Sequence, residues 1–93
     1  MIVGVLLVDV YIPESNSLKE KRSILKRLKD RIRNKFNVSV AEIDDHDIWR
    51  RAKMGIAHVS TSGKFSEKEL QKVAKFLESD FQIQVLDYEM RFL

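Results

Sequence analysis

The sequence predicts one α+β domain with elements in the order β-α-β-β-α-β. Four runs of apolar, mostly β-branched residues and two helical stripes, each preceded by a capping Ser, predict this order. The chain has 93 residues, of which 44% are hydrophobic and 33% charged. This is enough for one hydrophobic core, so residues 1–93 form a single domain.

The first strand covers residues 2–12, because it is apolar on both of its alternating faces. That pattern is typical of a strand in the middle of a sheet. Pro13 ends the strand and begins a turn. Ser17 then caps the first helix, and Glu20 completes a capping box. The helix ends near residues 34–37, and the buried stripe consists of Leu18, Leu25, Leu28, Ile32 and Phe36.

The second half contains three more strands and one helix. The strands cover about residues 38–43, 52–61 and 82–90. Ser66 and Glu69 predict the cap of the second helix, which precedes the last strand. The apolar face of this helix, closed by a residue just beyond its end, consists of Leu70, Val73, Ala74, Leu77 and Phe81.

Right-handed crossovers around a central hairpin make this order a ferredoxin-like sandwich, a four-stranded antiparallel sheet with two helices on one face. In the third strand, Gly55 and Ala57 are expected beneath a helix. Met54 and Ile56, with Leu86 of the last strand, are expected on the bare face. An apolar bare face predicts a homodimer, and the alternative is a ligand or nucleic acid on the sheet.

Two segments carry a family resemblance. Residues 17–22, SLKEKR, open the first helix, and residues 49–57, WRRAKMGIA, lead into the third strand. Through these segments the chain resembles the YlxP-like family of small bacterial proteins over essentially its whole length. The resemblance implies a ferredoxin-like fold. It also implies a cytoplasmic protein whose gene lies near genes for translation initiation and ribosome maturation.

Positive charge is concentrated in the first helix. Residues 17–36 have nine Lys or Arg and two acidic residues, although the whole chain has a net charge of only +3. At about 100° per residue, five of these cations fall in one stripe roughly 21 Å long beside the apolar face. This row predicts binding to phosphates, with Trp49, Arg50 and Arg51 as further candidates. The five residues are Lys19, Arg22, Lys26, Lys29 and Arg33.

Three alternatives accompany this interpretation. In the first, the row is a solvated helix face, since Lys and Arg are good helix formers. In the second, the row binds an acidic protein partner. In the third, Trp49 caps the end of the core instead of binding a ligand. We predict a non-enzymatic RNA- or ribosome-associated protein; the alternative is a homodimeric module that docks an acidic protein.

Several classes of function are not expected. The chain has no cysteine and only three glycines, and it contains no phosphate-binding Gly-rich loop and no catalytic triad, so we expect no catalytic residue and no cofactor. Residues 44–47, DDHD, form an acidic surface loop rather than a metal site. The apolar run at residues 2–8 is too short to span a bilayer and lacks the features of a signal peptide, so we expect a cytoplasmic protein without membrane contact.

Overall fold

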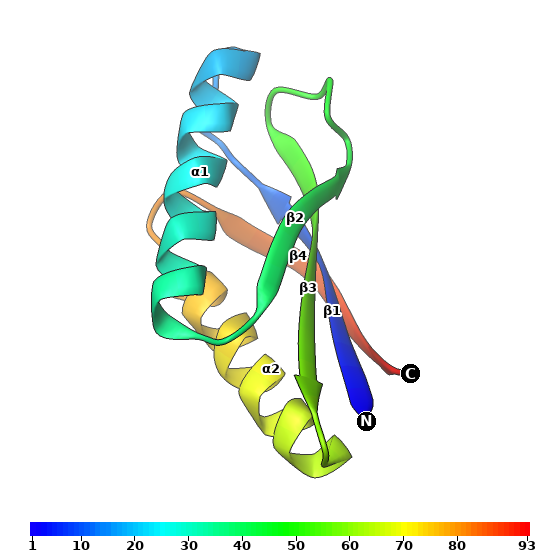
Figure 1. The fold of residues 1–93 in the computed structure, drawn as a ribbon. Coiled ribbons are helices and arrows are strands. Elements are labelled where there is room, and N and C mark those ends of the chain that lie inside the picture. Colours follow the sequence, from blue (N-terminus) through cyan, green and yellow to red (C-terminus); the bar gives the residue numbers. More distant parts are fainter.

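The computed structural model describes all 93 residues and confirms the predicted α+β fold. The sheet is antiparallel with the strand order β2-β3-β1-β4, and both helices lie on one face of it (Figure 1). No helix of the chain is long and apolar enough to cross a membrane. The elements are β1 (Ile2–Tyr11), α1 (Leu18–Lys35), β2 (Ser39–Asp44), β3 (Arg51–Ser60), α2 (Gly63–Glu78) and β4 (Gln84–Phe92).

β1 is a central strand, as its two apolar faces predicted. It pairs with β3 from Ile2 to Tyr11 and with β4 on its other side. The two chain ends lie side by side in Figure 1, because Val3 and Leu93 exchange backbone hydrogen bonds of 3.2 and 2.9 Å. β2 and β4 are therefore the edge strands of the sheet.

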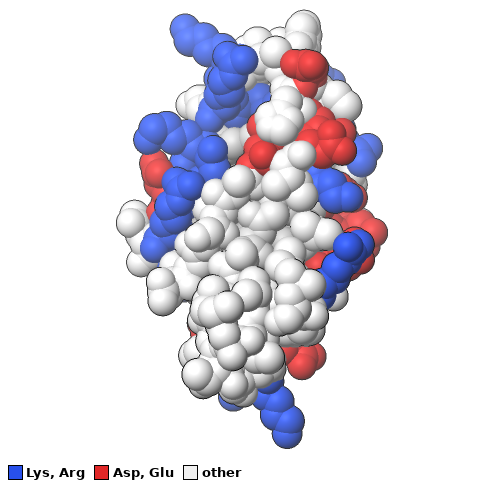
Figure 2. Space-filling model, turned by 45° about the vertical axis from the view of Figure 1, so that its right-hand side comes forward, with Lys and Arg blue, Asp and Glu red and all other residues white.

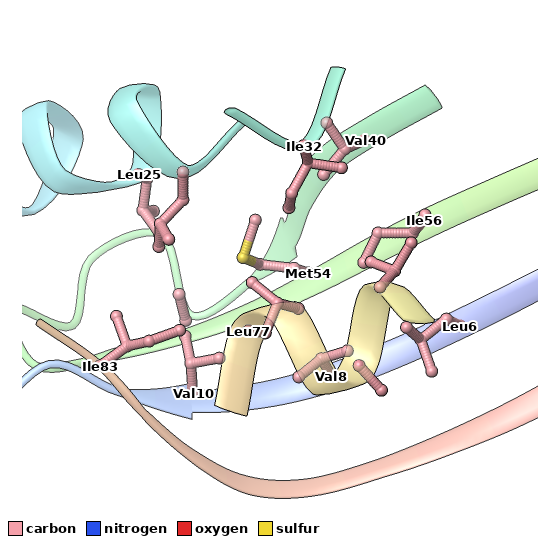
Figure 3. Packing of buried hydrophobic residues seen from close by; sticks show 14 of the residues in the cluster. Leu6, Val8, Val10, Leu25, Ile32, Val40, Met54, Ile56, Leu77 and Ile83 are labelled. Carbon is pink, nitrogen blue, oxygen red and sulfur yellow. The ribbon is translucent and has the colours of Figure 1, made fainter. Parts of the chain in front are cut away.

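The hydrophobic core lies between the sheet and the two helices. Side chains from β1 and β3 point toward the helices and meet apolar side chains of α1 and α2, such as Leu25 and Leu77 (Figure 3). Because each helix contributes one apolar stripe, two helices suffice to close this side of the sheet. The central core residues are Leu6, Val8, Val10, Leu25, Leu28, Ile32, Met54, Ile56, Leu70, Val73 and Leu77.

The predicted orientation of β3 is wrong. Met54 and Ile56 are fully buried beneath the helices, whereas Gly55 and Ala57 lie on the open face of the sheet. Alternation in a strand defines two faces but not which one the helices cover. The close approach of a helix occurs at Gly4 instead, where an added Cβ would lie 2.9 Å from Leu70 Cδ1.

The start of α1 was predicted correctly, whereas the start of α2 was not. Ser17 caps α1 as expected: its Oγ accepts from the Glu20 N–H at 3.1 Å, while the Glu20 carboxylate accepts from the Asn16 N–H at 2.7 Å. For α2 the prediction of Ser66 is wrong, because the cap is Ser62. Ser66 is buried inside the helix, where its Oγ lies 2.8 Å from Nδ1 of His58.

The boundaries at the end of α2 also differ from the prediction. Phe81 does not close the apolar face of this helix, since it is 84% exposed. Ile83 is buried in the core instead. β4 consequently begins at Gln84 and continues to Phe92, two residues later at each end than expected.

Candidate nucleic-acid interface

The charged residues of α1 lie on two different sides of the helix. Lys21, Leu25, Leu28 and Ile32 form the buried face. The five predicted cations occupy an arc of about 80° on one side of this face. That side faces β2, because Nη2 of Arg33 donates to the Val40 carbonyl of β2 at 3.0 Å. We term these five residues, Lys19, Arg22, Lys26, Lys29 and Arg33, the cationic row.

The cationic row is accessible to a partner. Four of its side chains are exposed and Lys29 is half-buried. Lys19, Arg22 and Lys29 form no ion pair with any acidic side chain. In Figure 2, Lys and Arg atoms gather along one side of the molecule next to an area without charged side chains. The row is therefore only partly neutralised from within the protein.

Asp30 is the one acidic residue beside the row. Its carboxylate lies 2.9 Å from Lys26 Nζ and 3.9 Å from Arg33 Nη1. The hydrogen bond from Lys26, together with the charges of Lys26, Arg33 and Lys29, holds the pKa of Asp30 below its usual value. Asp30 is exposed, so these pairs are screened by solvent and weaken as salt is added.

The cations on the opposite side of α1 are held by Asp80. Arg27 donates two hydrogen bonds to the Asp80 carboxylate, at 2.8 and 2.9 Å, and Arg31 lies 3.5 Å from it. Burial alone would raise the pKa of Asp80, but hydrogen bonds from Arg27 and the Gln82 N–H, with the charges of both arginines, lower it. Arg27 and Arg31 therefore link α1 to the α2–β4 connection.

Lys21 is buried, although its charge suggests a surface residue. It is 1% exposed, and its ammonium contacts the Glu42 carboxylate at 2.8 Å. This contact compensates Glu42 Oε2, which is buried and accepts no hydrogen bond. The signal that could have identified Lys21 is its spacing, four residues before Leu25 and therefore within the apolar stripe.

Lys21 also fixes the connection between β2 and β3. Its ammonium donates to the carbonyls of Asp45 at 2.5 Å and Ile48 at 2.8 Å. Between Asp45 and Ile48 the chain makes a turn, in which the Ile48 N–H donates a hydrogen bond of 3.0 Å to the Asp45 carbonyl. Asp45 has a left-handed φ of 65°. The connection thus lies against the first turns of α1 (Figure 1).

The three further candidates lie at this end of the molecule but have different environments. Trp49 is 54% exposed, so it does not cap the core. Arg50 donates from Nε to the Ser15 carbonyl at 3.0 Å and from Nη2 to Asn16 Oδ1 at 2.9 Å, which joins two loops. Arg51 is exposed at the start of β3, paired in register with Tyr11.

Comparison with known proteins identifies relatives of this chain. Residues 3–90 match the family described as protein of unknown function (DUF503). The chain is 48% identical over 77 residues to the uncharacterized protein YlxP of Bacillus subtilis (strain 168), an alignment covering 83% of this chain and 84% of that protein. The earlier resemblance is thus confirmed, and the chain belongs to the DUF503 family.

Proposed function

We propose that this protein binds RNA through the cationic row of α1. The observation that carries the proposal is the separation of charges on this helix. Arg27 and Arg31 are neutralised by Asp80, and Lys21 is paired with Glu42 inside the protein. Lys19, Arg22 and Lys29, in contrast, have no acidic partner and lie on one accessible side.

The row suits contacts with a series of phosphates. Its residues follow the helix over a length of about 21 Å, and each phosphate that a cation neutralises releases a counterion and so adds salt dependence. Phosphate contacts orient a protein without reading the base sequence. The recognition proposed is therefore of RNA shape, and it involves a single helix rather than the sheet face.

The connection after β2 adds a second type of contact. Trp49 offers an exposed indole ring, and Lys21 holds this connection beside the first turns of α1. An unpaired base could stack on such a ring, which typically contributes about 1–3 kcal/mol. Arg51 is exposed but lies on the open face of the sheet, paired with Tyr11 and away from α1, and the hydrogen bonds of Arg50 give it a structural role, so Trp49 is the candidate here that adds to the row.

The proposal is tested by co-sedimentation with purified ribosomal subunits over a salt titration. The variant replaces Arg22, Lys26 and Lys29 by Glu, and we expect its affinity to fall by roughly 100-fold or more at low salt. The slope of log affinity against log salt should become shallower by about 2–3. A control variant that replaces Lys64, Lys68 and Lys75 of α2 by Glu has the same net charge and should bind nearly as the wild type does.

The outcome also separates RNA from an acidic protein partner, which would use the same surface. In a pull-down with the immobilised protein, ribonuclease should abolish the capture of ribosomal components if the row binds RNA. Binding that survives the nuclease would indicate an acidic protein. Equal binding by the wild type and the α1 variant, with circular dichroism showing both folded, would refute the assignment to the cationic row.

A further inference from the structure

The centre of the sheet face opposite the helices is apolar and open to solvent. Two rows of residues cross its centre, Ala41–Gly55–Leu7–Glu89 and Ser39–Ala57–Val5–Arg91. The residues of these rows on β1, β2 and β3 line a shallow hollow of about 310 Å³, and Ile43 lies at its border. The hollow exists because Gly55, Ala57 and Ala41 have small side chains. Figure 2 shows this central area without charged atoms.

The edges of the sheet are less suited than its face to contact another chain. On β2, Arg33 occupies the Val40 carbonyl, and the register with β3 shifts between Glu42 and Asp44. On the other side of the sheet, the register between β1 and β4 shifts between Asp9 and Val10. Bulges and side chains that cover backbone groups are devices that prevent pairing at sheet edges. A partner is therefore expected on the open face.

The charges at the rim of this face define how a second copy would fit. The charged residues of the open face are Asp87, Glu89 and Arg91 on β4, Asp9 on β1, and Arg51 and Lys53 on β3, whereas the residues of β2 near the hollow are uncharged. A two-fold axis along the strands would place the acids of β4 over apolar β2. An axis perpendicular to the strands, through the hollow, instead places Glu89 of one copy opposite Arg91 of the other.

This second arrangement is self-complementary in its two central rows, whereas the charged row of Asp9, Lys53 and Asp87 lies one step farther along the strands. Within one protomer, Arg91 Nη2 lies 3.2 Å from Glu89 Oε1. The two-fold axis brings two such pairs together, so the four side chains alternate in charge. The same axis places Leu7 opposite the partner's Val5, and Gly55 opposite the partner's Ala57. A symmetric dimer requires this reciprocity, in which one patch serves both subunits.

The available area is sufficient for a dimer of moderate affinity. The strands have 10, 6, 10 and 9 residues and lie about 4.8 Å apart, so they present roughly 550 Å² per protomer. Two copies would thus bury about 1,100 Å², just above the roughly 1,000 Å² that a biological interface requires. A second copy of this chain is the partner that fits this face, because it matches the apolar centre, the symmetric Glu89 and Arg91 charges and the available area.

We infer that two copies of this protein form a dimer by stacking their open sheet faces, with strands antiparallel and Glu89 paired with Arg91 across the two-fold axis. This inference does not rest on RNA binding. Aligned packing of two sheets with their side chains interleaved is the usual geometry of a β-sandwich. Each protomer thereby covers the apolar face that its own two helices leave open.

Sedimentation velocity without RNA tests the inference, and the wild type should sediment as a dimer of the 10.9 kDa chain at tens of micromolar. Ala57→Glu puts a charge into the hollow and should weaken the dimer by at least tenfold. Phe81→Glu makes the same change in charge at an exposed site beyond this face and should leave the dimer intact. Circular dichroism verifies that each variant is folded.

A charge reversal tests the orientation. Glu89→Arg alone should weaken the dimer about tenfold, because two Arg–Arg contacts replace two ion pairs. The double variant Glu89→Arg/Arg91→Glu restores every pair with unchanged composition and should recover the wild-type dissociation constant. A monomeric wild type overturns the dimer. A double variant as weak as the single one overturns this two-fold arrangement, and either result leaves the RNA proposal standing.

Discussion

Replacing Lys21 by Met removes the ammonium that joins α1 to the β2–β3 connection while keeping most of the side-chain volume. In the wild type this group contacts the Glu42 carboxylate at 2.8 Å and the Asp45 and Ile48 carbonyls at 2.5 and 2.8 Å. The variant leaves a buried carboxylate oxygen without its counter-charge and two carbonyls without their donor. We expect both a loss of stability and a looser connection.

The size of the loss follows from the burial of these partners. Breaking a buried ion pair from one side costs about 3–5 kcal/mol. Ile48 is exposed and Asp45 half-exposed, so water can replace the ammonium at their carbonyls. We therefore expect a loss of stability at the lower end of this range, about 3 kcal/mol. For a domain of this size, such a loss corresponds to a fall of about 12–24 °C in Tm. Because most of this cost is the uncompensated carboxylate, the double variant Lys21→Met/Glu42→Gln should recover about 1–2 kcal/mol.

Urea unfolding followed by circular dichroism measures the global loss. The chain has a single Trp, so Trp49 fluorescence and its quenching by acrylamide report on the connection alone. Lys19→Met removes the same charge from an exposed position of α1 and should change stability by less than about 0.5 kcal/mol. If Lys21→Met is as stable as this control, the buried contacts of Lys21 do not hold the fold and the reasoning is refuted.

Two other predictions concern stability. The pKa of Asp80 is lower in the folded protein, so its carboxylate stabilises the fold above about pH 4 and this contribution is lost as the pH falls through the folded-state pKa. Asp80→Asn should therefore cost on the order of 2 kcal/mol at pH 7 and flatten the acid limb of a stability–pH curve; an unchanged limb would contradict this. Gly4→Ala places a Cβ 2.9 Å from Leu70 Cδ1 and should cost about 1–3 kcal/mol in urea unfolding. Gly63→Ala, with no atom within 4 Å of the new Cβ, should cost nothing.

The order of elements could be predicted because each depends on local sequence. Capping by Ser17, the apolar β1 and the helical spacing of Leu25, Leu28 and Ile32 all act within a few residues of the chain. The orientation of β3 could not be predicted, because both of its faces are apolar and only the packing of the helices determines which face is buried. The start of α2 was missed for a similar reason, since Ser62 and Ser66 are both good caps and the pairing of Ser66 with His58 is tertiary.

In the candidate site, too, the local features could be predicted from the sequence and the long-range contacts could not. The position of the cationic row follows from helical geometry, so it could be derived from residue spacing. The roles of Lys21 and Arg50 depend on backbone carbonyls at least 24 residues away in the sequence. Likewise, Asp80 lies 53 residues from Arg27. Long-range partners decide which cations of α1 remain free, and a count of charges in one segment overestimates them.

The two proposals are compatible because they use opposite sides of the sheet. α1 lies on the helix-covered face beside the edge strand β2, whereas the dimer contact is on the open face. A two-fold axis perpendicular to the strands stacks β2 on the partner's β2, so both cationic rows border the same edge of the dimer. One polyanion could then contact both rows, and the second contact would be intramolecular and strengthened by effective concentration. An axis along the strands would place the rows at opposite edges, where no such gain arises, so the orientation of the dimer determines whether its two rows act together.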